Sequence, residues 1–328
     1  MAPVAAADDP KEQEVLTVRL SGGYHFEQLE RLLRDLAPVL HLGARRRLMF
    51  DMGGLVFIGP TALALLVAVI KRLGNDALIG DGSRMRAPRS SMTNNYLMRM
   101  DLFKHLAGVE VDEPFERKKP VGFRPCQHFA TADEYRLVAK DLTDALIERC
   151  QTDTGARSAI RICLDELTEN VIHHADTGHG GFAAAQGWKQ KAEFEIGIVD
   201  MGVGIKTSLM KNPTYADIAQ DEDAIVTALR PRVSSTPERN AGIGLFITKL
   251  LLAANGGTLV VRSGYGRVVS GGENEKMTQT AAMPGTLVAL RARTDQALDI
   301  KSVYRQLDEI EQALDDHRSS KDKRDQTG

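Results

Sequence analysis

The chain has 328 residues, 43% of them hydrophobic and 26% charged, and its formal net charge at pH 7 is −2. These values exclude an intrinsically disordered protein, and the near-neutral balance excludes a general attraction to nucleic acid. Three cysteines are too few and too scattered for a disulfide framework, and the longest apolar run, 62–70, is shorter than the ~20 residues that cross a bilayer. We therefore expect a cytoplasmic protein of two domains, each with its own core, and no direct contact with nucleic acid or membrane.

The first 111 residues alternate strand-like and helix-like segments. Residues 1–13 carry acidic side chains and no apolar run, which predicts a disordered lead and not a secretion signal. Between residues 14 and 111 the predicted strands and helices alternate in the order 15–20, 26–40, 47–51, 61–72, 76–80 and 90–106. Alternation of this kind predicts a small α/β domain in which the helices pack on a sheet.

The segment 49–66 joins an apolar strand to an apolar helix at Gly59-Pro60-Thr61. Its order of elements resembles the STAS domain, the fold of the anti-sigma-factor antagonists, in which a strand ends in an acidic residue and two hydroxyl residues open the next helix. In this chain Gly59 stands at the acidic position and Pro60 at the first hydroxyl position, so Thr61 alone keeps a hydroxyl. The resemblance implies a docking or regulatory module, a STAS-like domain at 14–111.

Two roles for Thr61 are open. In the first, Thr61 only begins the helix behind Pro60, whose missing N–H costs nothing at that position. In the second, Thr61 is a phosphoacceptor at a helix N-terminus, where backbone N–H groups and the helix dipole favour an anion. The departures at Gly59 and Pro60 favour the first role and imply that regulated phosphorylation has been lost.

A linker and a second domain follow. Residues 112–122 contain two prolines, one glycine and six charged side chains, which predicts an exposed linker. The elements predicted in 123–293 are strands 126–131, 180–190, 193–199, 258–262 and 285–291 and helices 133–150, 156–175, 221–229 and 241–254. Two long connections remain: a polar segment at 206–240, predicted to be mobile, and a Gly- and Ser-rich excursion at 264–284.

The long helix places polar side chains on one face. Glu166, Asn170 and His174 recur at intervals of four, while a neighbouring face carries apolar residues. Asn170 can ligate Mg²⁺ through its carbonyl oxygen, and Glu166, one turn earlier, can orient or deprotonate an attacking hydroxyl. His173 and His174 fit a polar flank better than a phosphoaccepting role, because no helical hairpin with an exposed histidine precedes them.

Two pairs of glycines stand beside groups that can bind a nucleotide. Asp200 ends a buried strand and precedes Gly202 and Gly204, while Gly242 and Gly244 open a helix. Such an aspartate can accept a hydrogen bond from the exocyclic amine of adenine, and glycines let the backbone approach the ring. A helix N-terminus presents bare N–H groups to phosphate oxygens. Neither glycine pair extends to a third glycine and no P-loop motif occurs, which disfavours dinucleotide-binding and P-loop folds.

In this order, the motifs resemble the ATP-binding domain of the GHKL superfamily, shared by gyrase, heat-shock chaperone ATPases, histidine kinases and mismatch-repair ATPases. The resemblance covers 123–293 and implies a two-layer α/β sandwich of the Bergerat type with a mixed sheet, ATP or ADP with Mg²⁺, and a lid at 206–240. The similarity is greatest to the anti-sigma-factor serine/threonine kinases. It implies a catalytic base at Glu166, a Mg²⁺ ligand at Asn170, and nucleotide contacts at Asp200, Gly202, Gly204, Gly242, Gly244 and Thr286.

The C-terminal segment is amphipathic. Residues 294–317 predict a helix whose apolar positions are Leu298, Ile300, Val303, Leu307, Ile310 and Leu314. The last intervals are heptad-like, so packing onto the body and homodimerisation are both open. Residues 318–328 are small and charged, which predicts a disordered tail.

These features predict an ATP-binding regulatory protein of the partner-switching type. Glu166 indicates a serine/threonine protein kinase that acts on a STAS-domain partner or controls a sigma factor, because a pure binder needs no base there. The alternatives are a nucleotide-dependent binding switch without phosphotransfer and a histidine-kinase-like ATPase. Fusion of the STAS-like and kinase-like domains raises their local concentration and allows self-inhibition.

Overall fold

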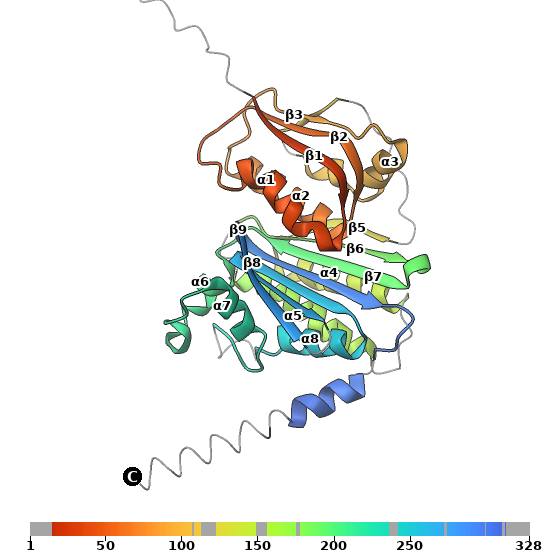
Figure 1. Ribbon diagram of the computed structural model, residues 1–328, viewed down its shortest axis with the longest axis vertical. Helices are drawn as coiled ribbons and strands as arrows, with labels where there is room; N and C mark the ends of the chain where they lie inside the picture. Colours follow the sequence, from red (N-terminus) through yellow and green to blue (C-terminus); the bar gives the residue numbers. More distant parts are fainter. Residues whose placement is uncertain are drawn as a thin grey trace, which may run out of the picture.

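The protein contains two sheets joined through a shared layer of helices. The computed structural model describes residues 15–106, 108–112, 123–148, 156–174, 178–235, 242–271, 274–298, 300–309 and 312. Within these ranges the chain forms an α/β structure with one sheet of four strands and one of five (Figure 1). The predicted linker 112–122 and the terminal segments 1–13 and 318–328 lie almost wholly outside the described residues.

The N-terminal part alternates strands and helices as predicted. Its elements are β1 (Leu16–Tyr24), a 3-10 turn (Phe26–Gln28), α1 (Leu29–Leu40), β2 (Leu48–Ile58), α2 (Pro60–Asn75), β3 (Arg84–Arg86), α3 (Ser91–Arg99), a second 3-10 turn (Leu102–His105) and β4 (Glu110–Val111). The four strands pair in sequence order, and each pair is parallel. Parallel neighbours require a crossover, and the helices between the strands provide it.

Two predicted elements of this part are wrong. The predicted strand 76–80 is a turn in which Ala77 has a φ of 56°, and only Ile79 makes an isolated bridge. The third strand begins later, at β3. The predicted helix 90–106 ends early because Asp101, with a φ of 57°, takes the left-handed conformation that no helix continues through.

The C-terminal part forms the second sheet and its helices. Its first elements are β5 (Phe123–Phe129), α4 (Ala132–Ile147), α5 (Ala156–His174), β6 (Gly181–Trp188), a 3-10 turn (Lys189–Lys191) and β7 (Glu193–Asp200). The remaining elements are α6 (Gly204–Leu209), a 3-10 turn (Pro213–Tyr215), α7 (Asp221–Ala228), α8 (Gly244–Ala254), β8 (Thr258–Gly271) and β9 (Asn274–Arg293). The order in the sheet is β5-β6-β7-β9-β8.

All strand pairs of the described five-stranded sheet are antiparallel, so the predicted mixed sheet is wrong. The reason is that β9 lies between β7 and β8, which run in the same direction and would otherwise form a parallel pair. The predicted excursion 264–284 is also wrong, because most of it continues the β8–β9 hairpin, where Gly266 pairs with Gln279 and Val269 with Lys276. Bulges beside Gly264 interrupt the pairing without ending it.

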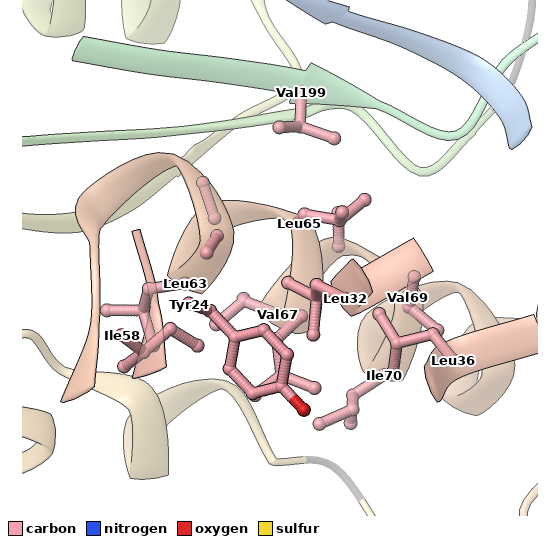
Figure 2. Packing of buried hydrophobic residues seen from close by; sticks show 14 of the residues in the cluster. Tyr24, Leu32, Leu36, Ile58, Leu63, Leu65, Val67, Val69, Ile70 and Val199 are labelled. Carbon is pink, nitrogen blue, oxygen red and sulfur yellow. The ribbon is translucent and has the colours of Figure 1, made fainter. Parts of the chain in front are cut away.

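Helices α1 and α2 lie between the two sheets, and α4, α5 and α8 cover the opposite face of the five-stranded sheet (Figure 1). Helix α2 packs against β6 and β7 as well as its own domain. This double cover explains why Thr61 to Ile70 is buried at every position and why the run Ala62–Ile70 has no polar residue. In Figure 2, Val199 points from β7 toward α2, and Val199 and Leu65 of α2 belong to the same core cluster. The N-terminal core therefore continues into the second sheet.

Strand β7 is buried on both faces, and its alternation assigns side chains to two different environments. Gly197 and Val199 face α2, whereas Ile196 and Ile198 belong to the core cluster under α4, α5 and α8. Asp200, the last residue of β7, follows the second set. One strand thus joins the interdomain contact to the face that carries the candidate site.

The C-terminal helix packs back onto the body over its described part. Residues 300–309 are helical. Leu298, Ile300, Val303 and Leu307 are buried in the cluster under α4, α5 and α8. The predicted apolar positions Ile310 and Leu314 lie outside the described residues.

Candidate functional site

A cavity opens between α5, the end of β7, the middle of β9, the α6–α7 segment and the start of α8. Seven of the predicted site residues line it, namely Glu166, Asn170, Asp200, Gly204, Gly242, Gly244 and Thr286. They come from several segments between Glu166 and Thr286, and the fold brings these segments to one place. The cavity also has apolar walls, among them Leu167, Ile198 and Val288, as ligand pockets usually have.

Helix α5 contributes one polar and one apolar face. Leu164 and Leu167 are buried in the core cluster, while Glu166 and Asn170, one turn apart, line the cavity. The predicted third member of the polar face, His174, and its neighbour His173 have side chains outside the described residues. The structure therefore supports the pairing of the carboxylate with the carboxamide and leaves the histidines untested.

Glu166 has an increased proton affinity. Burial raises the pKa of its carboxyl, and the negative charges of Glu169 and Asp165 raise it further. Arg161 donates to Asp165 at 2.6 Å and the Tyr135 hydroxyl donates to Glu169 at 3.1 Å, so both neighbours are held in place. General bases are commonly carboxylates that face a cavity and have a raised pKa, and Glu166 has both properties.

Asp200 is a buried hydrogen-bond acceptor. The Gly202 N–H donates to its Oδ1 at 2.8 Å. Burial raises the pKa of Asp200 to about 6, against the lowering effect of hydrogen bonds from Gly202 and Thr286. At neutral pH the group is therefore ionised, and its carboxylate can accept from a ligand amine as well as from the backbone.

Gly202 does not line the cavity, which differs from the predicted contact. Its N–H fixes the Asp200 carboxylate instead. Gly204 does line the cavity and has a φ of 80°, a conformation that favours glycine. A Cβ at Gly204 would lie 2.6 Å from the Ser263 Oγ, so the loop after β7 and the β8 strand approach closely.

Two residues that support this loop were missed by the sequence analysis. The Ser263 Oγ accepts from the Ile205 N–H at 2.8 Å and donates to the Gly285 carbonyl at 3.0 Å. Gly285 has a φ of 76°, and a Cβ there would lie 2.2 Å from the Asp200 carbonyl oxygen. Gly285 stands directly before Thr286 and was a recognisable signal, whereas nothing in the sequence marks Ser263.

The second glycine pair closes the site from α8. A Cβ at Gly244 would lie 2.4 Å from the Cβ of Glu166, so glycine allows α8 to begin against α5. Gly242 has a φ of 66°, and a Cβ there would lie 2.4 Å from the Val233 carbonyl oxygen. Both glycines are thus required by close approach of the backbone, in agreement with a site in which the α8 N-terminus faces the cavity.

The described part of the predicted lid, 206–235, adds hydroxyl groups to the cavity. Ser208, Ser234 and Ser235 line it, and the Ser208 Oγ lies 3.4 Å from the Ser235 Oγ. The sequence analysis predicted only a mobile segment with a helix at 221–229 and did not single out these serines. The rest of the predicted lid, 236–240, lies outside the described residues.

The residues present fit a nucleotide with a magnesium ion. Asp200 offers a buried acceptor, Gly204 and Gly242 bring bare backbone to the cavity wall, and Asn170 offers a carbonyl oxygen. Among the described residues no group of three or more His, Cys, Asp or Glu side chains suits a metal ion. A magnesium ion at this cavity would thus take most of its ligands from phosphate and water.

Thr61 lies on the opposite face of the five-stranded sheet from the cavity. Its side chain is 0% exposed, and a Cβ at Gly197 would lie 2.4 Å from its Cα. Its N–H donates to the Glu195 Oε1 at 3.2 Å. Glu195, which the sequence analysis missed, is 2% exposed and places its carboxylate at the N-terminus of α2, where a negative group is favoured.

Comparisons with known proteins do not indicate a function, so a function has to be inferred from the geometry of the cavity. Among the described residues, no helix combines the length and apolar character needed to span a membrane. No protein-family model matches the sequence, and a search of curated proteins finds no match.

Proposed function

We propose that the protein is an ATP-binding regulator of the partner-switching type, with serine/threonine kinase activity toward a STAS-type partner or control over a sigma factor. In this proposal residues 123–293 are a GHKL domain of the Bergerat fold, residues 14–111 are a STAS-like domain, and the protein acts in the cytoplasm. The single observation that carries the proposal is the convergence of Glu166, Asn170 and Asp200 with the two glycine turns in one cavity.

The adenine end of the nucleotide lies at the end of β7. The exocyclic amine donates to the Asp200 carboxylate, whose orientation the Gly202 N–H fixes. Gly204 and Thr286 border the ring, and the backbone at Gly204 approaches it because no Cβ intervenes. A buried ionised acceptor discriminates against bases without an amine, because its hydrogen bond would then be left unmade.

The phosphate end lies between α5 and α8. The N-terminus of α8 at Gly244 directs backbone N–H groups and the positive end of the helix dipole toward phosphate oxygens. Asn170 provides the protein ligand for magnesium, which, when bound, neutralises charge on the phosphates. The serine hydroxyls at 208, 234 and 235 approach from the α6–α7 side and exclude water.

Glu166 provides the proton acceptor for phosphoryl transfer. The hydroxyl oxygen of the partner forms a bond to the γ-phosphorus while the bond from phosphorus to the β–γ bridging oxygen breaks, and ADP leaves. The hydroxyl proton passes to the Glu166 carboxylate. The raised pKa of Glu166 favours this step, because the carboxylate holds a proton more tightly than an exposed glutamate does.

The acceptor hydroxyl belongs to a separate partner. Thr61 of the same chain is buried on the far face of the sheet, against Gly197 and Glu195. A cis transfer to Thr61 would require removal of α2 from β6 and β7. This arrangement supports a role of the STAS-like domain as part of the kinase body.

The test is transfer of radiolabelled phosphate from ATP to candidate STAS proteins by the full chain. We expect Glu166→Gln to lower the rate by about 10²- to 10⁴-fold while ADP affinity changes little. Glu148→Gln, at the end of α4 and paired with Arg124 away from the cavity, is the matched control and keeps transfer. Transfer that persists in Glu166→Gln would remove the carboxylate from the mechanism.

A nucleotide-dependent binding switch without phosphotransfer is the second candidate. It is supported by the burial of Thr61 and by the carboxylate of Glu195 at the helix N-terminus where a phosphate would otherwise bind. In this case ATP and ADP alter the affinity for a partner by at least about fivefold, and no labelled protein forms. The same labelling experiment, combined with partner binding in ATP and in ADP, separates the two candidates.

A further inference from the structure

Arg262 is a fully buried cation that connects the two domains. Its side chain is 0% exposed, and its Nε donates to the Glu30 Oε1 of α1 at 2.8 Å. Its Nη1 donates to the carbonyls of Gly264 and Gly266 at 3.0 and 2.9 Å, and its Nη2 donates to the Ala281 carbonyl at 2.5 Å. One guanidinium therefore holds both strands of the β8–β9 hairpin at its bulges while it is paired with the N-terminal domain.

The residue after Arg262 holds the loop of the candidate nucleotide site. Ser263 is 2% exposed, and its Oγ accepts from the Ile205 N–H and donates to the Gly285 carbonyl. The Ser263 contacts thus connect the turn at Gly204 with the strand that carries Thr286. Because Arg262 and Ser263 are consecutive, the position of one backbone restricts the position of the other.

The bulge after Ser263 contacts the segment that closes the cavity. The Tyr265 N–H donates to the Asp221 Oδ2 at 2.9 Å, and a Cβ at Gly264 would lie 2.4 Å from the same oxygen. Asp221 begins α7, which leads to Ala228 and Val233 in the cavity wall. The hairpin bulge is therefore packed against both the loop after β7 and the start of α7.

We infer that Glu30 of the N-terminal domain positions the nucleotide site through Arg262 and the bulge at 263–265. The ion pair fixes the bulge, Ser263 fixes the loop at Gly204 and Ile205, and Tyr265 fixes α7. The effect on nucleotide binding rests on the proposed function, whereas the effect on the loop does not. Glu30, Arg262 and Ser263 are positioning residues, and none of them lines the cavity.

A second ion pair across the same interface offers a matched control. The Arg291 Nη1 on β9 pairs with Glu27 of the turn before α1. This pair also joins the N-terminal domain to the second sheet, but Arg291 lies opposite Thr258 and Glu195 in the sheet, away from the bulge. Loss of either ion pair weakens the contact between the domains. Only loss of the Glu30 pair is expected to change the loop at Gly204 and the start of α7.

The experiment compares Glu30→Gln, Glu27→Gln and Ser263→Ala in the full chain. Calorimetric titration with ADP and magnesium is expected to show about tenfold weaker binding for Glu30→Gln and Ser263→Ala, and less than about twofold for Glu27→Gln. Hydrogen exchange is expected to accelerate at 204–209 and 221–228 in Glu30→Gln and Ser263→Ala, and not in Glu27→Gln. Thermal unfolding checks that each variant is folded at the titration temperature.

The outcomes separate this inference from the proposed function. Equal ADP affinity and equal exchange in Glu30→Gln and Glu27→Gln would overturn the positioning role even if wild-type protein binds ADP. Absence of ADP binding by wild-type protein would reject the proposed function, and the exchange data would still support or overturn the positioning role. An equal loss of affinity in both glutamate variants would mean that only general loosening of the interface is involved, which also overturns it.

Discussion

The two faces of the five-stranded sheet differ in what covers them. On one face, α2 lies so close to β7 that Gly197 is in contact with the backbone of Thr61. On the other face, the same strand ends in Asp200 at a cavity bordered by the short helices α6 and α7. The first face is closed by a helix that is buried all round, and the second is bordered by short helices around a cavity.

This difference changes the expected role of the N-terminal domain. The resemblance to STAS proteins implied a docking module that could meet its own kinase domain as a substrate. Because the core of α2 continues into β6 and β7, the domain instead forms a layer behind the sheet face that carries the candidate site. Release of the N-terminal domain is therefore expected to require much more free energy than a local opening of the cavity, although the Glu30–Arg262 pair couples the two.

The largest effect is expected from breaking the closed face. Gly197→Val places side-chain atoms inside the contact with Thr61, where even a Cβ would lie 2.4 Å from the Cα. We expect the free energy of unfolding of the full chain in urea to fall by about 3 kcal/mol or more. Gly43→Ala is the control, because a Cβ there meets nothing within 4 Å. A loss below about 1 kcal/mol in Gly197→Val would show that the two parts are not tightly packed.

The next effect concerns the open face. Asp200→Asn keeps one oxygen for the Gly202 N–H but turns an amide donor toward the adenine amine. We expect calorimetry to show about 10- to 100-fold weaker binding of ADP with magnesium. Asp51→Asn, which removes a carboxylate paired with Arg86 in the four-stranded sheet, is expected to leave the affinity unchanged. Unaltered affinity in Asp200→Asn would remove the adenine contact from the account.

The pH dependence sharpens the same point. Burial raises the pKa of Asp200 to about 6, so ADP affinity should fall by up to about tenfold per pH unit below that value. Titrations with Asp200→Asn correct for protonation of the nucleotide itself.

The stability of the protein without ligand is expected to change with pH in the opposite direction. The contribution of Asp200 to stability is complete below its unfolded pKa and is lost as pH rises through about 6. Asp200→Asn should therefore raise the melting temperature of the nucleotide-free protein at pH 7.

The smallest effect is expected at the rim of the closed face. The Glu27 side chain, paired with Arg291, is 64% exposed. Glu27→Gln should lower the free energy of unfolding in urea by no more than about 1 kcal/mol, since exposed ion pairs contribute little. A loss above about 2 kcal/mol would mean that charge, and not the apolar packing of α2, holds the two parts together.

The sequence was informative where local chemistry decides the structure. Pro60 at the first turn of α2, the apolar pattern of β7 and the spacing of Glu166 and Asn170 predicted elements that the structure contains, and Glu166 and Asn170 line one cavity. The apolar run 62–70 indicated a buried helix. It did not indicate what covers the second side, because burial by the same domain and by another domain leaves the same pattern.

The sequence was uninformative where a distant partner decides. The composition of 264–284 predicts a loop, yet pairing between β8 and β9 and the bonds of Arg262 order most of it as strands. Glu195 and Ser263 are ordinary strand residues until tertiary contacts place them beside Thr61 and Ile205. Such roles depend on contacts between residues more than fifty positions apart, which no local pattern encodes.

The most direct test of the account is calorimetric titration of the full chain with ATP or ADP in the presence of magnesium. The account predicts saturable binding of one nucleotide per chain that depends on magnesium and is weakened in Asp200→Asn. Absence of binding by the folded wild-type protein would contradict the central claim, that the cavity between α5, β7 and α8 is a nucleotide site.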